Sequence, residues 1–149
     1  MLRPGGLGVC AVRRGMAIKR IDHIAIAVED MSQSLSFWEK ALGLEVHEIR
    51  NVPEQTVDIA CLPVGASEVE LVKPVTADSG IAKWLAKRGP GIHHICFEVD
   101  DIRATLAELS MQGVELIDKQ PHTSADGKLY AFVHPKSAGG VLIELYQLS

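Results

Sequence analysis

The sequence predicts an α+β protein in which two tandem βαβββ modules form one curved, half-closed mixed sheet with the helices outside. A strand-like stretch at residues 21–30 recurs at 92–101 and places His23 on His94, an offset of 71 residues (94 − 23). The helix-like run and the glycine after each copy recur at nearly the same offset. Such a fixed spacing indicates a duplicated unit. Neither copy is long enough to bury a sheet alone, so we expect the two sheets to pack side by side.

The first module is predicted to span about residues 18–74. Its first strand alternates, with branched aliphatic side chains toward the core and small side chains beside His23. Asp30 is placed to cap the helix that follows, and Gly43 is placed to end it in the left-handed conformation. Three further strands are predicted at 44–49, 56–62 and 68–73.

A linker at about 76–91 contains a short helix at 81–88 and leads into the second module, predicted at about 92–149. This module repeats the plan of the first. Its opening strand is followed by a helix that Asp100 or Asp101 caps and Gly113 ends. Its strands are predicted at 92–99, 114–117, 129–133 and 141–146. Residues 18–149 are therefore expected to form a single domain.

Composition limits the classes of function. The chain has 149 residues, of which 47% are hydrophobic and 23% charged, as in ordinary soluble globular proteins. A net charge of −4 without a large Lys/Arg cluster in the body argues against nucleic-acid binding. No apolar run approaches the roughly 20 residues of a membrane span, so we expect no membrane partner.

The N-terminus and the cysteines bear on the compartment. Residues 1–17 are rich in arginine and contain no acid, and we predict a disordered or over-extended segment there. Three widely spaced cysteines do not form a disulfide framework, which favours a reducing compartment. We predict a cytoplasmic protein. The alternative is the mitochondrial matrix, because transit peptides share this composition.

Each module also ends in a strand with a carboxylate between aliphatic residues, Glu70 in the first and Glu144 in the second, at an offset of 74 (144 − 70). Together with His23 and His94 they provide two imidazoles and two carboxylates. This donor set suits a borderline divalent ion such as Co²⁺, Zn²⁺, Ni²⁺, Fe²⁺ or Mn²⁺. An octahedral ion would keep about two open positions for a bidentate oxygen substrate and Lewis-acid catalysis. His93 alternates onto the opposite face, so we expect its side chain to leave the cleft.

Four stretches carry a family resemblance, at residues 22–28, 51–55, 81–95 and 134–145. The chain resembles the vicinal oxygen chelate, or glyoxalase-type, superfamily, and within it the methylmalonyl-CoA epimerases. The linker helix and the turn His134-Pro135-Lys136-Ser137 are the specific features. The paired βαβββ plan is shared by many activities.

The resemblance implies metal ligands at His23, Glu70, His94 and Glu144, with Co²⁺ favoured and Zn²⁺, Ni²⁺ or Mn²⁺ as alternatives. It implies an acyl-CoA substrate, a homodimer, and interconversion of (R)- and (S)-methylmalonyl-CoA by proton abstraction at C2 through a metal-chelated enolate. Glu144 is the implied catalytic acid/base, doubling as a ligand. Glu70 stands where some epimerases carry Gln and others Glu.

Epimerisation needs a proton delivered to the opposite face of C2, so a second acid/base or one mobile group is required. Some epimerases carry a Glu at the position that Ile59 occupies in this chain. Asp58 is beside it, but strand alternation points its side chain away from the cleft. A bound water or another side chain remains an alternative.

Three other functions share the predicted fold. Glyoxalase I uses the same ligand types and similar proton-transfer chemistry, but the linker helix and the 134–145 region favour an epimerase. An extradiol dioxygenase would use two histidines and one carboxylate on iron, and a second carboxylate at Glu70 argues against it. A metal-free binding or resistance protein would have no need for four ligand types in matching positions.

Overall fold

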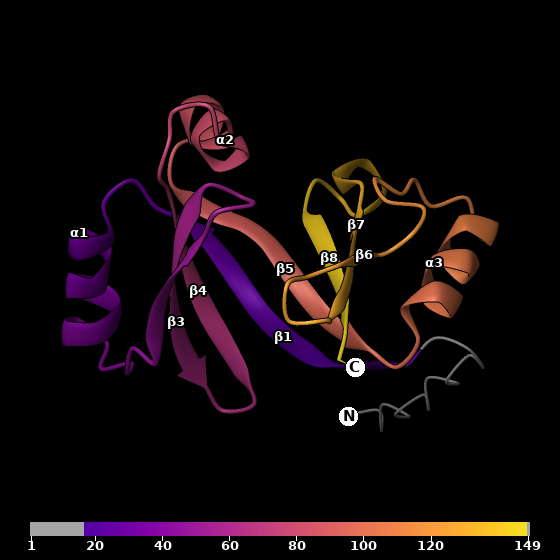
Figure 1. Ribbon diagram of the computed structural model, residues 1–149, viewed down its shortest axis with the longest axis horizontal. Helices are drawn as coiled ribbons and strands as arrows, with labels where there is room; N and C mark the ends of the chain where they lie inside the picture. The colour runs from indigo at the N-terminus through magenta and orange to yellow at the C-terminus, as the bar shows by residue number, and fades with distance from the viewer. Residues whose placement is uncertain (1–16, 149) are drawn as a thin grey trace, which may run out of the picture.

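The computed structural model describes residues 17–148, and in it eight strands form one mixed sheet (Figure 1). The predicted N-terminal segment therefore lies outside the described residues except for Ala17. From one edge to the other, the strands are β2 (Glu48–Val52), β3 (Val57–Val64), β4 (Ser67–Pro74), β1 (Ile18–Ala27), β5 (Gly91–Val99), β8 (Leu142–Gln147), β7 (Leu129–Val133) and β6 (His122–Thr123). The predicted fold class, a curled mixed sheet built from two similar halves, is confirmed.

The two halves meet at β1 and β5, which pair antiparallel at the centre of the sheet. On one side β1 pairs in parallel with β4, and on the other β5 pairs in parallel with β8. Figure 1 shows these two central strands running side by side between the halves. The strands of the predicted first module thus continue directly into those of the second.

Helices pack on the outer face of each half. In the first, α1 (Met31–Leu35) continues as a π-helical segment, η1 (Ser36–Ala41); in the second, α3 (Ile102–Met111) is a regular α-helix. As predicted, the Asp30 carboxylate accepts a hydrogen bond from the backbone of Gln33, and Asp101 does the same for the second helix. Figure 1 places α1 and α3 at opposite ends of the molecule, with the strands between them.

The linker forms α2 (Gly80–Arg88), and the 134–140 turn contains a short 3₁₀ segment, η2 (Pro135–Ser137). Ser79 caps α2, its hydroxyl accepting a hydrogen bond from the backbone of Ala82. No helix within residues 17–148 is long and apolar enough to cross a membrane.

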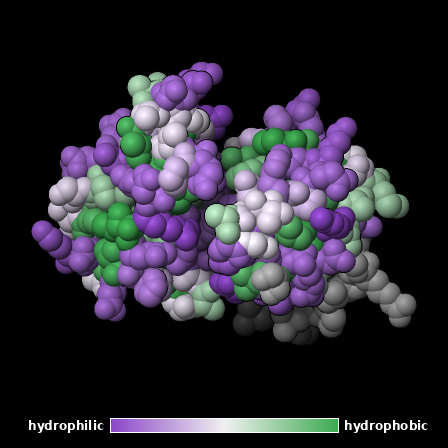
Figure 2. Space-filling view, viewed as in Figure 1, coloured by the Kyte–Doolittle hydropathy of each residue, from purple (hydrophilic) through white to green (hydrophobic). Residues whose placement is uncertain are grey.

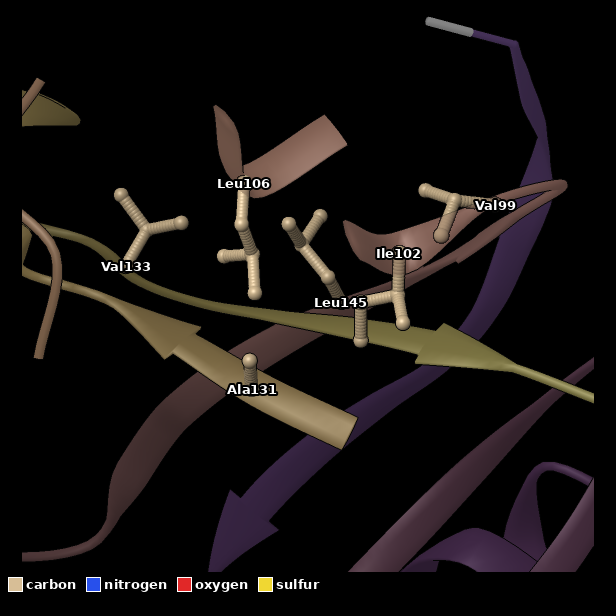
Figure 3. Close-up of a cluster of buried hydrophobic side chains, with 6 residues drawn as sticks. All are labelled: Val99, Ile102, Leu106, Ala131, Val133 and Leu145. Atoms are coloured by element: carbon tan, nitrogen blue, oxygen red, sulfur yellow. The ribbon is translucent and has the colours of Figure 1, made fainter. Parts of the chain in front are cut away.

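The hydrophobic core divides with the modules. In the second, side chains from β5, β7 and β8 pack under α3 (Figure 3). In the first, one cluster packs under α1 and η1, and another packs on the opposite face of the sheet, beside Ile81 of α2. This second cluster contains Ala25, Val57, Ile59, Cys61 and Val72. The face of β1 with small side chains beside His23 is therefore packed at its Ala25 end.

The predicted strand at 114–117 is not formed. Leu116 makes only an isolated bridge to Val133, and the edge strand of this half is the two-residue β6. The reason lies in Asp118, whose carboxylate accepts a hydrogen bond from the backbone N–H of Phe132. A side chain thus takes the place of a backbone acceptor, which interrupts regular pairing with β7.

The first half also departs from prediction before β2. The strand begins at Glu48, four residues later than expected, because Leu44 and Val46 pack against the helix cluster instead of entering the sheet. Gly43 has the predicted left-handed conformation (φ +83°), as does Gly113 (φ +81°).

Candidate metal centre

The four predicted ligands come from the four central strands: His23 from β1, Glu70 from β4, His94 from β5 and Glu144 from β8. All four project from the sheet face opposite α1 and α3. The register explains their convergence, since Cys96 is the partner of His23 on one side and of Glu144 on the other. Strand pairing therefore brings together side chains that are far apart in the sequence.

His23 lies at the middle of the cluster. Its Nε2 is 3.2 Å from Nε2 of His94 and 3.3 Å from a carboxylate oxygen of Glu144. Nε2 of His94 is 3.0 Å from the same Glu144 oxygen. Atoms that could ligate an ion, one from each of these three residues, all lie within 4.8 Å of one another.

Glu70 stands at one side of this trio. Its carboxylate lies 3.5 Å from Nε2 of His23, and its other oxygen accepts a hydrogen bond of 3.4 Å from Arg50. It also belongs to a second group of possible ligands with Glu68 and Cys61. The two oxygens of Glu70 therefore have different neighbours, so one can face the ligand cluster while the other stays with Arg50.

Burial and neighbouring charges shift the pKa values of His23, Glu144 and Glu70 in different directions. Burial alone would lower the pKa of His23, but hydrogen bonds with Asp22 and Glu144 and the charge of Glu70 raise it to about 10. For Glu144, hydrogen bonds from the two histidines outweigh burial and lower the pKa to about 2. Burial raises the pKa of Glu70 above its usual range. In the absence of another cation, a proton on His23 compensates the carboxylates.

This donor chemistry fits a divalent cation. The carboxylates of Glu70 and Glu144, at most 13% exposed, face two imidazole nitrogens that approach each other to 3.2 Å, a distance that requires a proton or a metal ion between or beside them. Imidazole and carboxylate together are ligands that borderline divalent ions accept. His23, His94 and Glu144 would hold the ion, with Glu70 as the adjacent fourth group.

Two residues that sequence reasoning did not assign to the site lie directly behind the histidines. The Asp22 carboxylate is 2.8 Å from Nδ1 of His23, and Nδ1 of His93 is 2.8 Å from Nδ1 of His94. His93 does point away from the ligand cluster, toward Trp84 of α2, with ring centroids 5.2 Å apart. The signal was available, because each of these residues immediately precedes a ligand histidine in the repeat.

The two positions considered for a second acid/base, Asp58 and Ile59, both lie on β3. Asp58 lies on the helix-facing side of β3, where its carboxylate accepts a hydrogen bond from the Asn51 side chain. Ile59 lies on the same face as the ligands but is buried in the apolar cluster with Ala25 and Val72. Neither supplies an acidic group to the cluster.

Aromatic side chains line the second-module side of the cluster. The Phe132 ring packs edge-on against His94, with centroids 5.8 Å apart, and Tyr130 follows along the same face of β7. On the first-module side, α2 packs over the sheet through Ile81. Figure 2 shows a largely hydrophilic face with a notch between α2 and the second half at the top of the view.

Comparison with known proteins agrees with this architecture. Residues 22–132 match the family described as the Glyoxalase/Bleomycin resistance protein/Dioxygenase superfamily. A Bacillus subtilis (strain 168) protein, YqjC, is 42% identical over 86% of this chain and 91% of its own length. The mitochondrial methylmalonyl-CoA epimerase of Homo sapiens is 39% identical over 86% of this chain and 73% of its own length.

Among solved structures, a Streptomyces coelicolor methylmalonyl-CoA epimerase variant in complex with 2-nitronate-propionyl-CoA superposes with a TM-score of 0.80. It is 37% identical, and the match covers 89% of this chain and 96% of that one. Fold and relatives therefore agree that this chain is an enzyme of the Glyoxalase/Bleomycin resistance protein/Dioxygenase superfamily and belongs to its methylmalonyl-CoA epimerase family.

Proposed function

We propose that this protein interconverts (R)- and (S)-methylmalonyl-CoA by removing and returning the proton at C2. The observation that carries the proposal is the convergence of His23, His94 and Glu144 from both halves of the sheet, in a chain whose relatives are epimerases. The substrate C–H lies between a thioester and a carboxylate, and both groups can accept the negative charge that deprotonation leaves behind.

His23, His94, Glu70 and Glu144 would hold a divalent ion, for which we favour Co²⁺, with Zn²⁺, Ni²⁺ or Mn²⁺ as alternatives. A bound ion would supply Lewis-acid stabilisation of charge developing on the substrate oxygens. The protein contributes rigidity, since all four residues project from paired central strands. It also contributes exclusion of water, because the four side chains are at most 13% exposed.

We assign Glu144 as one proton carrier. Hydrogen bonds from the two histidines lower the pKa of its carboxylate, so the group carries no proton of its own before the transfer. It is hydrogen-bonded to both histidines, which keeps one oxygen oriented toward the cluster. The second transfer takes place at the opposite face of C2. Asp58 points away from the cluster, which leaves a bound water or another side chain for that step.

The assembly and the compartment are part of the same proposal. We expect a homodimer. Its molar mass, measured by light scattering during size-exclusion chromatography, tests this. We expect cytoplasmic protein, with the mitochondrial matrix as the alternative, and the N-terminal sequence of the native protein separates the two. We also propose, from the internal repeat, that the domain consists of two modules at about 18–74 and 92–149.

The experiment that tests the reaction is incubation of methylmalonyl-CoA with the Co²⁺-loaded protein in D₂O. We expect deuterium to appear at C2 and the two epimers to equilibrate. Absence of exchange, together with turnover of a glutathione hemithioacetal, would instead identify a glyoxalase. Metal analysis of protein purified without chelator gives an independent check, since about one ion per chain is expected and a metal-free binding protein would contain none.

A further inference from the structure

The two candidate ligand histidines share one geometry. Each directs Nε2 toward the cluster, where the two nitrogens lie 3.2 Å apart, and each presents Nδ1 to a neighbour behind it. For His23 that neighbour is the Asp22 carboxylate, and for His94 it is the imidazole of His93, both at 2.8 Å. Asp22 and His93 hold the same place in the repeat, one residue before the ligand.

The tautomers follow from this geometry. An imidazole that binds a metal through Nε2 carries its proton on Nδ1 and donates it to whatever lies behind. Nδ1 of His94 must then donate to Nδ1 of His93. His93 can accept only if that nitrogen is unprotonated, so its own proton is on Nε2. One metal ligand is thus supported by an anion and the other by a neutral ring.

Each supporting residue is itself held, by different means. Asp22 forms a 2.8 Å ion pair with Arg20, which in turn pairs with Glu98 at 2.6 Å. His93 packs edge-on against Trp84, and the Arg88 guanidinium lies 5.8 Å from the centre of that indole. The chain of contacts behind His23 is ionic, whereas the chain behind His94 is aromatic and comes from α2, which has no counterpart in the other half.

We propose that His93 is a positioning residue for the metal site, setting the tautomer and ring orientation of His94 as a neutral hydrogen-bond acceptor in the place that Asp22 occupies behind His23. This inference rests on the proposed metal site. It assigns a role to α2, because Trp84 restricts the His93 ring to the orientation that accepts from His94. Loss of such a supporting partner weakens metal affinity by about 10- to 100-fold.

The test uses His93→Phe, which keeps a ring against Trp84 but removes the acceptor, and His93→Gln, which retains an acceptor oxygen. Co²⁺ affinity is measured by competition with a chelator. We expect His93→Phe to bind Co²⁺ about 10- to 100-fold more weakly than the parent. The Gln variant should stay within a few-fold of the parent. Circular dichroism of the metal-free proteins checks that each variant is folded.

A second readout does not depend on affinity. In the Co²⁺-loaded parent, the Nδ1–H protons of His23 and His94 should each give a paramagnetically shifted, solvent-exchangeable NMR resonance. His93→Phe should shift the His94 resonance or speed its exchange with water, and leave the His23 resonance unchanged. The matched variant Asp22→Asn should affect the His23 resonance.

The outcomes are distinct. Unchanged affinity and unchanged resonances in His93→Phe would overturn the role of His93 while leaving the metal site intact. An equal loss in His93→Phe and His93→Gln would also overturn it, because the hydrogen bond would not then be what matters. If the parent protein itself binds no Co²⁺, the proposed metal site is wrong. This outcome differs from the two above, which would overturn only the role of His93.

Discussion

The helices of the two halves begin and end alike but differ in between. Asp30 and Gly43 are 13 residues apart (43 − 30), whereas Asp101 and Gly113 are 12 apart (113 − 101). The shorter span forms the regular helix α3. The longer span forms α1 followed by the π-helical η1, in which the backbone N–H of Leu42 donates to the carbonyl of Phe37 five residues back. One additional residue between fixed ends is accommodated as a wider turn.

The same contrast holds at the candidate metal centre. The ligand types repeat from one half to the other, while the residues behind them differ in charge and in what holds them. The two halves therefore agree in the strands and candidate ligands and differ in the residues that contact the candidate ligands from behind. The comparison can be tested with paired substitutions, one in each half.

The ligand carboxylates should give the largest difference between the halves. Glu144→Ala removes a proton carrier and a ligand, and we expect kcat/KM to fall by about 10³- to 10⁴-fold with loss of bound metal. Glu70→Gln retains an oxygen ligand and should keep both metal and measurable activity. Steady-state kinetics with metal analysis makes the comparison. Full activity in the Glu144→Ala protein would exclude this site.

The two cores should be equally sensitive. Leu62 of β3, in the cluster under α1, and Leu106 of α3, in the cluster of the second half, are both buried, so each change to alanine should cost about 2–5 kcal/mol in unfolding free energy. Because β1 and β5 join the halves, we expect one cooperative transition in each variant. Thermal and denaturant melts followed by circular dichroism measure this. Two separate transitions would show that the halves unfold independently.

Single-residue deletions should distinguish the two helices. Removing the exposed Lys40 from η1 should convert the wide turn to an α-helical one and change stability by about 1 kcal/mol or less. Removing the exposed Ala107 from α3 rotates the following residues by about 100° and turns Leu109 from the core, which should cost about 2 kcal/mol or more. Comparable losses in both would contradict the explanation of η1.

The smallest effect is expected at Asp58. Its side chain is on the helix-facing side of β3 and bonds Asn51, so Asp58→Asn should change kcat/KM by less than about two-fold and stability by less than about 0.5 kcal/mol. The same assays apply. A large loss of activity would mean that Asp58 reaches the reacting centre after all.

Much of this molecule follows from the repeat. Alternation in the strands around His23 and His94 predicts which side chains share a face, and pairing of the central strands then brings the candidate ligands together. Asp30 and Asp101 act as helix caps, as their position before an apolar run predicts. These features depend on short-range patterns that both halves retain.

Other features depend on contacts that the pattern does not encode. The strand predicted at 114–117 is lost to one side-chain hydrogen bond, from Phe132 to Asp118. The π-helical turn follows from a one-residue difference between two offsets, 71 from His23 to His94 and 70 (113 − 43) from Gly43 to Gly113. The difference is visible in the sequence, but no residue propensity indicates a π-helix. The role of His93 was missed because alternation correctly places it off the ligand face, while its ring nitrogen still meets His94.

The central seam between β1 and β5 has a further consequence. Each half supplies one histidine and one glutamate, so a half paired with an identical copy along the same seam would present the same four side chains under two-fold symmetry. Joining the halves in one polypeptide removes the requirement that they be identical. A carboxylate behind one histidine and an imidazole behind the other cannot occur in a symmetric pair of identical halves.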